Sequence, residues 1–167
     1  RFVNNSLSRS NTPRKSRIKM SEEKLKRQSW DAYFIQIAEQ ISKRSTCDRL
    51  NVGAILVKDK LIIGSGYNGS PRFLKHCSEN NHLMQGDDTH CKNVIHAEIN
   101  CIAMAAKQGI SVDGSSLYVT HCPCWECFKV LINCGIKNVY YLNDYKNSMY
   151  VFKAAMELKI GLFKVVV

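Results

Sequence analysis

The stretch that decides the fold is SSLYVTHCPCWECFKVLINCGIKNVYYL, residues 115–142. Its first apolar run, residues 115–120, predicts a buried strand. Residues 123–135 predict a helix, because a proline lies near its first turn and Gly135 suits its end. The apolar run at 138–142 predicts a second strand. A strand, a helix and a strand in succession predict two parallel strands joined by a crossover helix.

Elements of the same two kinds flank this unit. Apolar residues at helical spacing predict a helix over 29–45, with Ser29 as its N-cap, and further helices over 94–109 and 149–159. Residues 52–69 predict two strands that turn at 58–60, and residues 161–167 predict a closing strand. Residues 70–92 have no period and predict a long loop. The order of elements predicts an α/β layered sheet with a parallel portion.

The net charge of +10 is concentrated at one end of the chain. Residues 1–19 hold six of the 24 basic residues and no acidic one, which leaves 18 basic against 14 acidic residues elsewhere. We expect residues 1–19 to be a disordered basic tail, and residues 20–167 to form a single zinc-dependent domain. The tail reads either as an upstream addition without a role or as an organelle presequence.

The eight cysteines of the chain need an explanation, and three of them crowd into THCPCWEC, residues 120–127. They are disulfide partners, buried small hydrophobic residues or metal ligands. No apolar run is long enough to predict a membrane span, and no secretory signal is evident. We therefore expect a cytoplasmic protein with reduced thiols, unless the tail directs it to an organelle, and this favours metal binding.

Two short motifs each begin a predicted helix. His96 lies in HAE, residues 96–98, and Cys124 and Cys127 lie in PCWEC, residues 123–127. Successive helices that follow parallel strands begin at one edge of the sheet, so the three side chains can converge. One imidazole and two thiolates leave tetrahedral zinc one open position, as in catalytic sites. A Cys-x-x-Cys alone would fit a redox motif or a structural zinc knuckle equally well.

Glu98 completes this set. It lies two residues after His96, within reach of a zinc-bound water, whose pKa zinc lowers to about 7. H-x-E followed by P-C-x-x-C is the known signature of zinc-dependent base deaminases. We therefore expect a catalytic Zn²⁺ held by His96, Cys124 and Cys127, with Glu98 as the catalytic proton carrier.

From about Trp30 to Tyr145 the chain resembles the deoxycytidylate (dCMP) deaminases of bacterial and phage type. The resemblance rests on the segments RSTC, VGAILVKD, GYNGSP, HAEINCI, YVT, PCWEC and GIKNVYYLNDYK. It implies the three-layer αβα cytidine deaminase-like fold with a mixed five-stranded sheet. It also implies hydrolysis of dCMP to dUMP with release of ammonia, which supplies thymidylate synthesis.

The resemblance also implies roles for individual residues. The Ala97 backbone N–H is placed to bind the pyrimidine O2, and carbonyl groups near His121 or Cys122 to hold the amino group. Asn68 matches the position that contacts the deoxyribose hydroxyl, although beside Gly69 it is also an ordinary turn residue. Lys107 and Tyr145 are candidates for the 5′-phosphate.

Some members of this family carry a second, structural zinc near the end of the first helix and the long loop. Here the candidate ligands are Cys47, Cys77, His82 and Cys91, with His90 as a substitute. The alternative is that they are unlinked loop residues. Cys101 and Cys134 fall on helix core positions, and they and Cys122 are interpreted as packing residues.

The resemblance implies a homo-oligomer, often a hexamer, with dCTP as activator and dTTP as inhibitor. Two other functions stay open from the sequence. One is deamination of another cytosine nucleotide or of a nucleic-acid base, which the near-balanced charge after residue 19 disfavours. The other is a zinc-stabilised binding module without catalysis, in which Glu98 would have no role.

Overall fold

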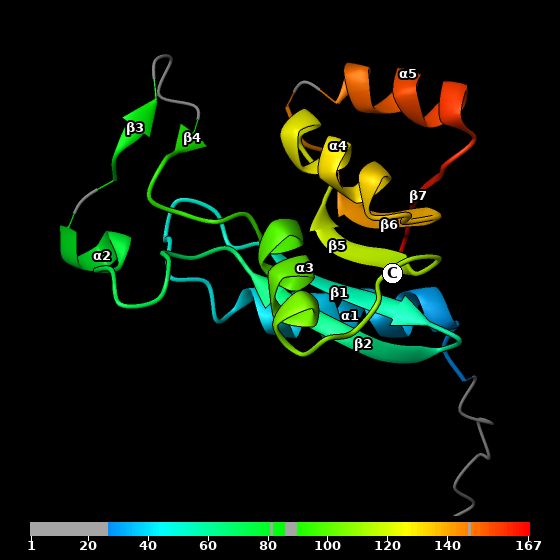
Figure 1. Ribbon diagram of the computed structural model, residues 1–167, viewed down its shortest axis with the longest axis horizontal. Helices are drawn as coiled ribbons and strands as arrows, with labels where there is room; N and C mark the ends of the chain where they lie inside the picture. Colours follow the sequence, from blue (N-terminus) through cyan, green and yellow to red (C-terminus); the bar gives the residue numbers. More distant parts are fainter. Residues whose placement is uncertain (1–26, 81, 86–89, 147) are drawn as a thin grey trace, which may run out of the picture.

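A single mixed sheet organises the chain. The computed structural model describes residues 27–80, 82–85, 90–146 and 148–167. Five strands pair in the order β2-β1-β5-β6-β7 (Figure 1). The three strands β5, β6 and β7 are parallel, whereas β1 runs antiparallel to β2 and to β5. Their bounds are β1 (Gly53–Lys58), β2 (Leu61–Tyr67), β5 (Ser116–His121), β6 (Asn138–Asn143) and β7 (Gly161–Lys164).

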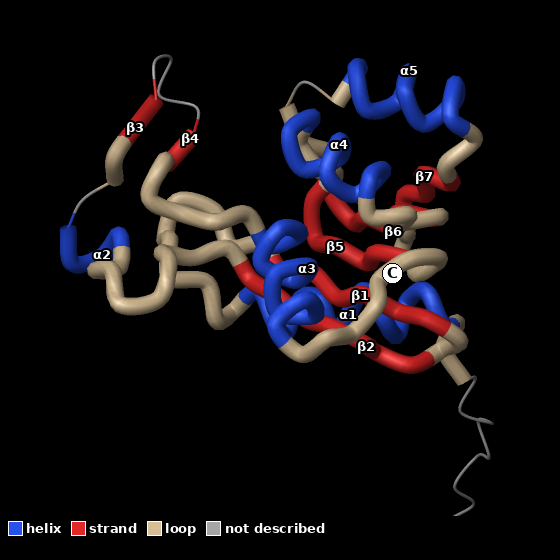
Figure 2. The backbone as a smooth tube through the Cα atoms, in the orientation of Figure 1, coloured by secondary structure: helices blue, strands red, loops and turns tan. Residues whose placement is uncertain are grey.

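Helices cover both faces of this sheet and make three layers, as expected. One face packs against α1 (Trp30–Ser42), and the other against α3 (Ala97–Lys107), α4 (Trp125–Asn133) and α5 (Met149–Leu158) (Figures 1 and 2). The inner strand β1, between β2 and β5, shows why. Its side chains alternate between the faces, so that Ala54 and Leu56 join the core beneath α3, while Ile55 and Val57 join the core beneath α1.

The hairpin of β1 and β2 turns where the sequence predicts. Lys58 pairs with Leu61, which leaves Asp59 and Lys60 as a two-residue loop with φ of 52° and 64°. Positive φ at both positions matches the twist of the strands that the loop joins. The prediction that residues 70–92 are entirely loop is wrong. They contain α2 (Cys77–Asn80), β3 (Met84–Gln85) and β4 (His90–Cys91), which are too short to show a period in the sequence.

The predicted basic tail, residues 1–19, lies outside the described residues, as do residues 20–26 of the predicted domain. Among the helices of the described part, none combines the length and the apolar character needed to cross a bilayer.

Close contact between β2 and α3 fixes the start of α3, where the predicted metal ligand His96 lies. A Cβ added to Gly66 would lie 2.5 Å from the Cys101 backbone N and 2.6 Å from the Ala97 carbonyl O. Both atoms belong to the backbone of α3, so they cannot move aside as a flexible side chain would. Gly66 therefore lets the helix approach the sheet.

We predict that Gly66→Ala lowers the free energy of unfolding by about 3 kcal/mol or more, because overpacking forces backbone shifts. Gly64→Ala on the same strand is the matched control, since its Cβ would meet α3 at 3.5 Å or more, an ordinary contact. Urea unfolding followed by circular dichroism measures both. Equal stability of the two variants would contradict this account of the contact.

Candidate active site

Three predicted metal ligands meet where α3 and α4 begin. His96 is the N-cap of α3 and Cys124 is the N-cap of α4. His96 Nδ1 lies 3.5 Å from Cys124 Sγ and 3.3 Å from Cys127 Sγ. All three donor atoms lie within 4.8 Å of one another. The expected convergence of His96, Cys124 and Cys127 is therefore what the structure shows.

The local sequence accounts for this geometry. After β5 ends, Pro123 precedes the N-cap, and the Cys124 Sγ accepts a hydrogen bond from the Cys127 backbone N–H at 3.5 Å. Interaction with the Cys127 thiol and with the His96 ring lowers the pKa of Cys124 to about 4. The positive end of the helix also favours a thiolate here.

The donor set fits zinc. With Zn–S bonds of about 2.3 Å and Zn–N bonds of about 2.0 Å, tetrahedral coordination separates nitrogen from sulfur by about 3.5 Å. The two His96–sulfur separations, 3.5 and 3.3 Å, match this value. Three protein ligands of this kind leave a tetrahedral ion one further position, which a water or a substrate can take.

Glu98 is buried beside these ligands, with 5% of its surface exposed. Burial raises the pKa of Glu98 to about 7, against an opposing effect of the His96 ring. Its carboxyl also interacts with the Cys127 thiol. A carboxyl group that exchanges its proton near neutral pH is suited to act as both acid and base.

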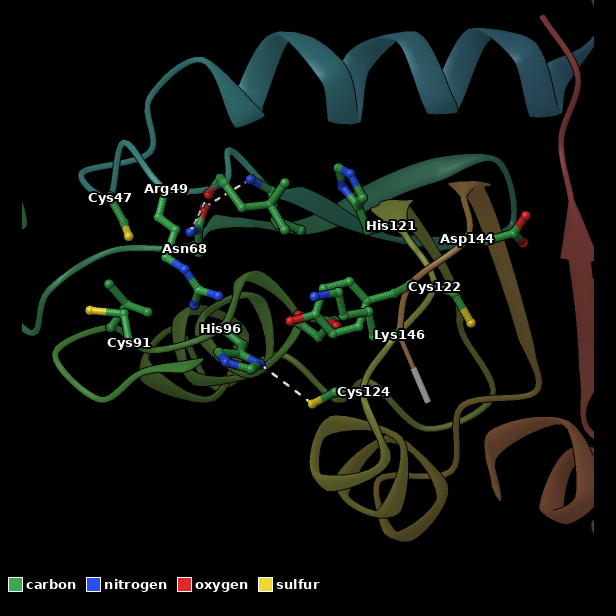
Figure 3. Close-up of a pocket in the computed structure, with 15 residues that line it drawn as sticks. Cys47, Arg49, Asn68, Cys91, His96, His121, Cys122, Cys124, Asp144 and Lys146 are labelled. Carbon is green, nitrogen blue, oxygen red and sulfur yellow. Dashed lines mark hydrogen bonds between the residues drawn. The ribbon is translucent and has the colours of Figure 1, made fainter. Parts of the chain in front are cut away.

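These groups open into a cavity of about 390 Å³, which is a size that small-molecule sites occupy. The cavity is lined by His96, Cys124, Asn68 and His121 (Figure 3), and also by Glu98 and Tyr145. The size and the mixture of apolar and polar groups suit a small molecule that has both apolar and polar parts.

Only some of the predicted substrate-binding residues lie at the cavity. Asn68 lines the cavity, but its side-chain amide holds the main chain: Oδ1 accepts from the Val52 N–H at 2.8 Å, and Nδ2 donates to the Leu50 carbonyl at 2.7 Å. Ala97 is the first residue of α3, where backbone N–H groups lack intrahelical acceptors. Lys107 is not brought to the cavity, because it lies in the last turn of the same helix.

Sequence reasoning missed two cations at the cavity wall, Arg49 and Lys146. Figure 3 shows Arg49 extending toward the side that His96 occupies. Each of them adjoins a residue that the sequence did single out, since Arg49 follows Cys47 by two positions and Lys146 follows Tyr145. That proximity to motif residues is the signal that could have identified them.

A second group of ligand-type side chains lies beside the cavity, and we call it the cysteine cluster: Cys47, Cys77, His82 and Cys91. One donor atom from each lies within 4.8 Å of the others. Cys77 Sγ and Cys91 Sγ are 3.6 Å apart, and His82 Nδ1 is 3.7 Å from Cys47 Sγ. The proposed substitute, His90, has a side chain that lies outside the described residues.

The other three cysteines are packed, as predicted. Cys101 and Cys122 belong to the main core, and the half-buried Cys134 packs against it. None of the eight cysteines of the chain forms a disulfide.

Comparison with known proteins agrees with this site. Residues 28–143 match the model of the cytidine and deoxycytidylate deaminase zinc-binding region. The chain is 47% identical over 126 residues to ComE operon protein 2 of Bacillus subtilis, covering 75% of this chain and 66% of that protein. It is 33% identical over 134 residues to the deoxycytidylate deaminase of Saccharomyces cerevisiae, covering 77% of this chain and 42% of the yeast protein.

A solved structure shares the fold. The dCMP deaminase of cyanophage S-TIM5 in complex with dCMP and dUMP superposes with a TM-score of 0.69 at 34% identity. The match covers 80% of this chain and 95% of the cyanophage chain. The resemblance drawn from the motifs is thus confirmed, and the chain belongs to the family of cytidine and deoxycytidylate deaminases that share this zinc-binding region.

Proposed function

We propose that this chain hydrolyses dCMP to dUMP and ammonia, and so supplies the substrate of thymidylate synthesis. One observation carries the proposal: His96, Cys124 and Cys127 form an open zinc-ligand set, and the buried Glu98 lies beside it at the wall of a cavity. The likeness to the cyanophage enzyme, whose structure holds dCMP and dUMP, supports this substrate.

In this proposal Glu98 is the proton carrier. Bound zinc would supply a nucleophile at neutral pH by lowering the pKa of a coordinated water. Glu98 takes one proton from the attacking water and gives it to N3 of the cytosine ring. It then takes the remaining proton of that water from the hydroxyl added at C4 and gives it to the amine, which leaves as ammonia. Its pKa of about 7, raised by burial, allows the same carboxyl to act in both directions.

The cavity wall would hold the base. His121 and Cys122 line the cavity at the end of β5, where their carbonyl groups are candidates to accept from the exocyclic amino group. The Ala97 N–H is a candidate donor to the pyrimidine O2, because it belongs to the first turn of α3. Tyr145 is half-buried and lines the same cavity, which makes its ring a candidate to pack beside the base.

We assign the 5′-phosphate to Arg49 and Lys146 in preference to Lys107. Both line the cavity, and a guanidinium pairs well with phosphate oxygens because its donors are arranged as a fork. The nearby Asp144 lines the cavity as well, and its carboxylate pairs with Lys164. Asn68 stays a candidate for the deoxyribose hydroxyl through the hydrogen-bonding capacity that its two main-chain contacts leave.

The cysteine cluster would hold a second, structural zinc. The 3.6 Å between Cys77 Sγ and Cys91 Sγ is close to the edge of a tetrahedron built on Zn–S bonds of about 2.3 Å. His82 Nε2 lies 3.0 Å from the Asp48 carboxylate, while its Nδ1 faces the cluster. A carboxylate that orients the far side of a histidine ring is typical of metal sites.

We also propose that the chain forms a homo-oligomer, by resemblance a hexamer, which dCTP activates and dTTP inhibits. Met149, Phe152 and Met156 recur at i, i+3 and i+7 on α5, and each is exposed. An apolar stripe of this kind on an outer helix supports contact with another copy of the chain.

We predict that Glu98→Gln retains zinc but lowers turnover of dCMP on the order of 10³-fold or more, because the amide cannot carry a proton. Ammonia release measures turnover, and atomic absorption measures zinc. Glu126→Gln is the control, since Glu126 lies exposed on α4 and pairs with Lys129. Ordinary turnover of dCMP by Glu98→Gln would contradict the role of Glu98 as proton carrier.

We predict that Arg49→Ala raises KM for dCMP about 10-fold or more, because a charged hydrogen bond to phosphate is lost. KM for deoxycytidine, which has no phosphate, should stay the same. Lys107→Ala is the matched control and should change neither value. A similar rise in KM for both substrates in Arg49→Ala would contradict the phosphate assignment.

A further inference from the structure

The cysteine cluster and the substrate cavity share a wall. Cys47 and Cys91 belong to the cluster and also line the cavity, whereas Cys77 and His82 belong to the cluster alone. Figure 3 shows Cys47 and Cys91 on one side of His96 and Cys124 on the other. A metal ion bound to both Cys47 and Cys91 would therefore also connect two parts of the cavity wall.

Hydrogen bonds connect the Cys47 segment to the segment that carries Asn68. The Ser45 hydroxyl lies 3.1 Å from the Cys47 carbonyl and 3.0 Å from the Asn68 carbonyl, and it accepts from the Cys47 N–H at 3.2 Å. The Thr46 N–H donates to the same Asn68 carbonyl at 3.3 Å, and its hydroxyl accepts from the Ser70 N–H at 3.0 Å. These hydrogen bonds therefore couple the position of the Cys47 segment to that of the Asn68 segment.

The Asn68 segment in turn holds two functional parts. The Asn68 side chain binds the main chain at Leu50 and Val52, in the segment that directly follows Arg49. Gly69 and Ile95 exchange two backbone hydrogen bonds, at 3.1 and 2.9 Å. Ile95 directly precedes the ligand His96.

The Cys91 segment also connects the cysteine cluster to the cavity wall. Cys91 precedes His96 by five residues, and Val94, between them, packs against the buried cysteines and lines the cavity. In contrast, Cys124 and Cys127 are positioned by β5 and α4, which contribute no residue to the cysteine cluster. The cysteine cluster therefore shares segments with the substrate side of the active site and shares none with Cys124 and Cys127.

We infer that the cysteine cluster positions the substrate wall of the active site, so that its metal governs substrate binding and not only the folding of a loop. The inference rests on the proposed function. Without the metal, Cys47 and Cys91 separate, and the segments that carry Arg49, Asn68 and Ile95 lose their fixed positions. The zinc-ligand set persists, because His96 is held as the N-cap of α3, which packs on β2, and Cys124 and Cys127 are held at the start of α4.

Cys77→Ser tests this inference, because Cys77 is a member of the cysteine cluster and does not line the cavity. We expect zinc content to fall from about two ions per chain to about one. We expect KM for dCMP to rise about 10-fold or more, since small misplacements of a binding wall are costly, while kcat stays similar. Cys134→Ser is the control: that thiol is half-buried and lies in neither ligand set.

A second readout does not depend on turnover. Hydrogen exchange in Cys77→Ser should quicken at residues 45–50, 68–70 and 91–95, and should stay as in the wild type across β5 and α4. His82→Gln, at a half-buried position, supplies a second variant if Cys77→Ser does not fold. Should wild-type protein release no ammonia from dCMP, the proposed function fails, and the exchange pattern still decides the inference.

Three results would overturn the inference. Zinc that stays at about two ions per chain in both variants would show that Cys77 and His82 hold no metal. Loss of one ion with an unchanged KM for dCMP and unchanged hydrogen exchange would show that the cysteine cluster stabilises only its own loop. Loss of both ions, with exchange quickened across β5 and α4 as well, would show that the two sites are not separable.

Discussion

Three electron-rich atoms that converge within a few ångströms are the constraint on which the structure depends. The Nδ1 of His96 lies 3.5 and 3.3 Å from the two sulfurs of Cys124 and Cys127. Two thiolates and a nitrogen lone pair repel one another unless a cation or protons lie between them. The same three groups suit zinc in both chemistry and spacing. The rest of the fold can be understood as the means of holding them there.

Holding them requires two helices to begin at one sheet edge. The crossover from β5 through α4 places the paired cysteines, and the packing of α3 on β2 places His96. A glycine at position 66 permits that packing, because no side chain fits between the strand and the helix backbone. Burial under these elements also raises the pKa of Glu98 to about 7, which is what a proton carrier needs.

Much of this could be predicted from the sequence. The helix and strand periods predicted an α/β layered sheet with a parallel portion, and the two short motifs predicted the ligand set, because each depends on local spacing. The three layers and the mixed five-stranded sheet were implied by the family resemblance. The four members of the cysteine cluster were also named, from their residue types and from the second zinc that the resemblance implies, and they are brought together.

Features that depend on distant contacts could not be predicted. Arg49 and Lys146 meet at one cavity only through the fold, so their nearness in sequence to Cys47 and Tyr145 does not by itself show that they line a cavity. The two-residue strands β3 and β4 are too short to show alternation. Asn68 was assigned to a substrate, and its contacts with Leu50 and Val52 show a second use that no motif indicates.

The most direct test of the central claim is a zinc-edge anomalous scattering map from crystals of the zinc-loaded protein. The account predicts an ion bonded to His96 Nδ1 and to the sulfurs of Cys124 and Cys127 at about 2.0–2.3 Å, with its fourth position held by a water or a ligand beside Glu98. An ion whose fourth position is closed by a protein side chain, or no ion among these three residues, would contradict it.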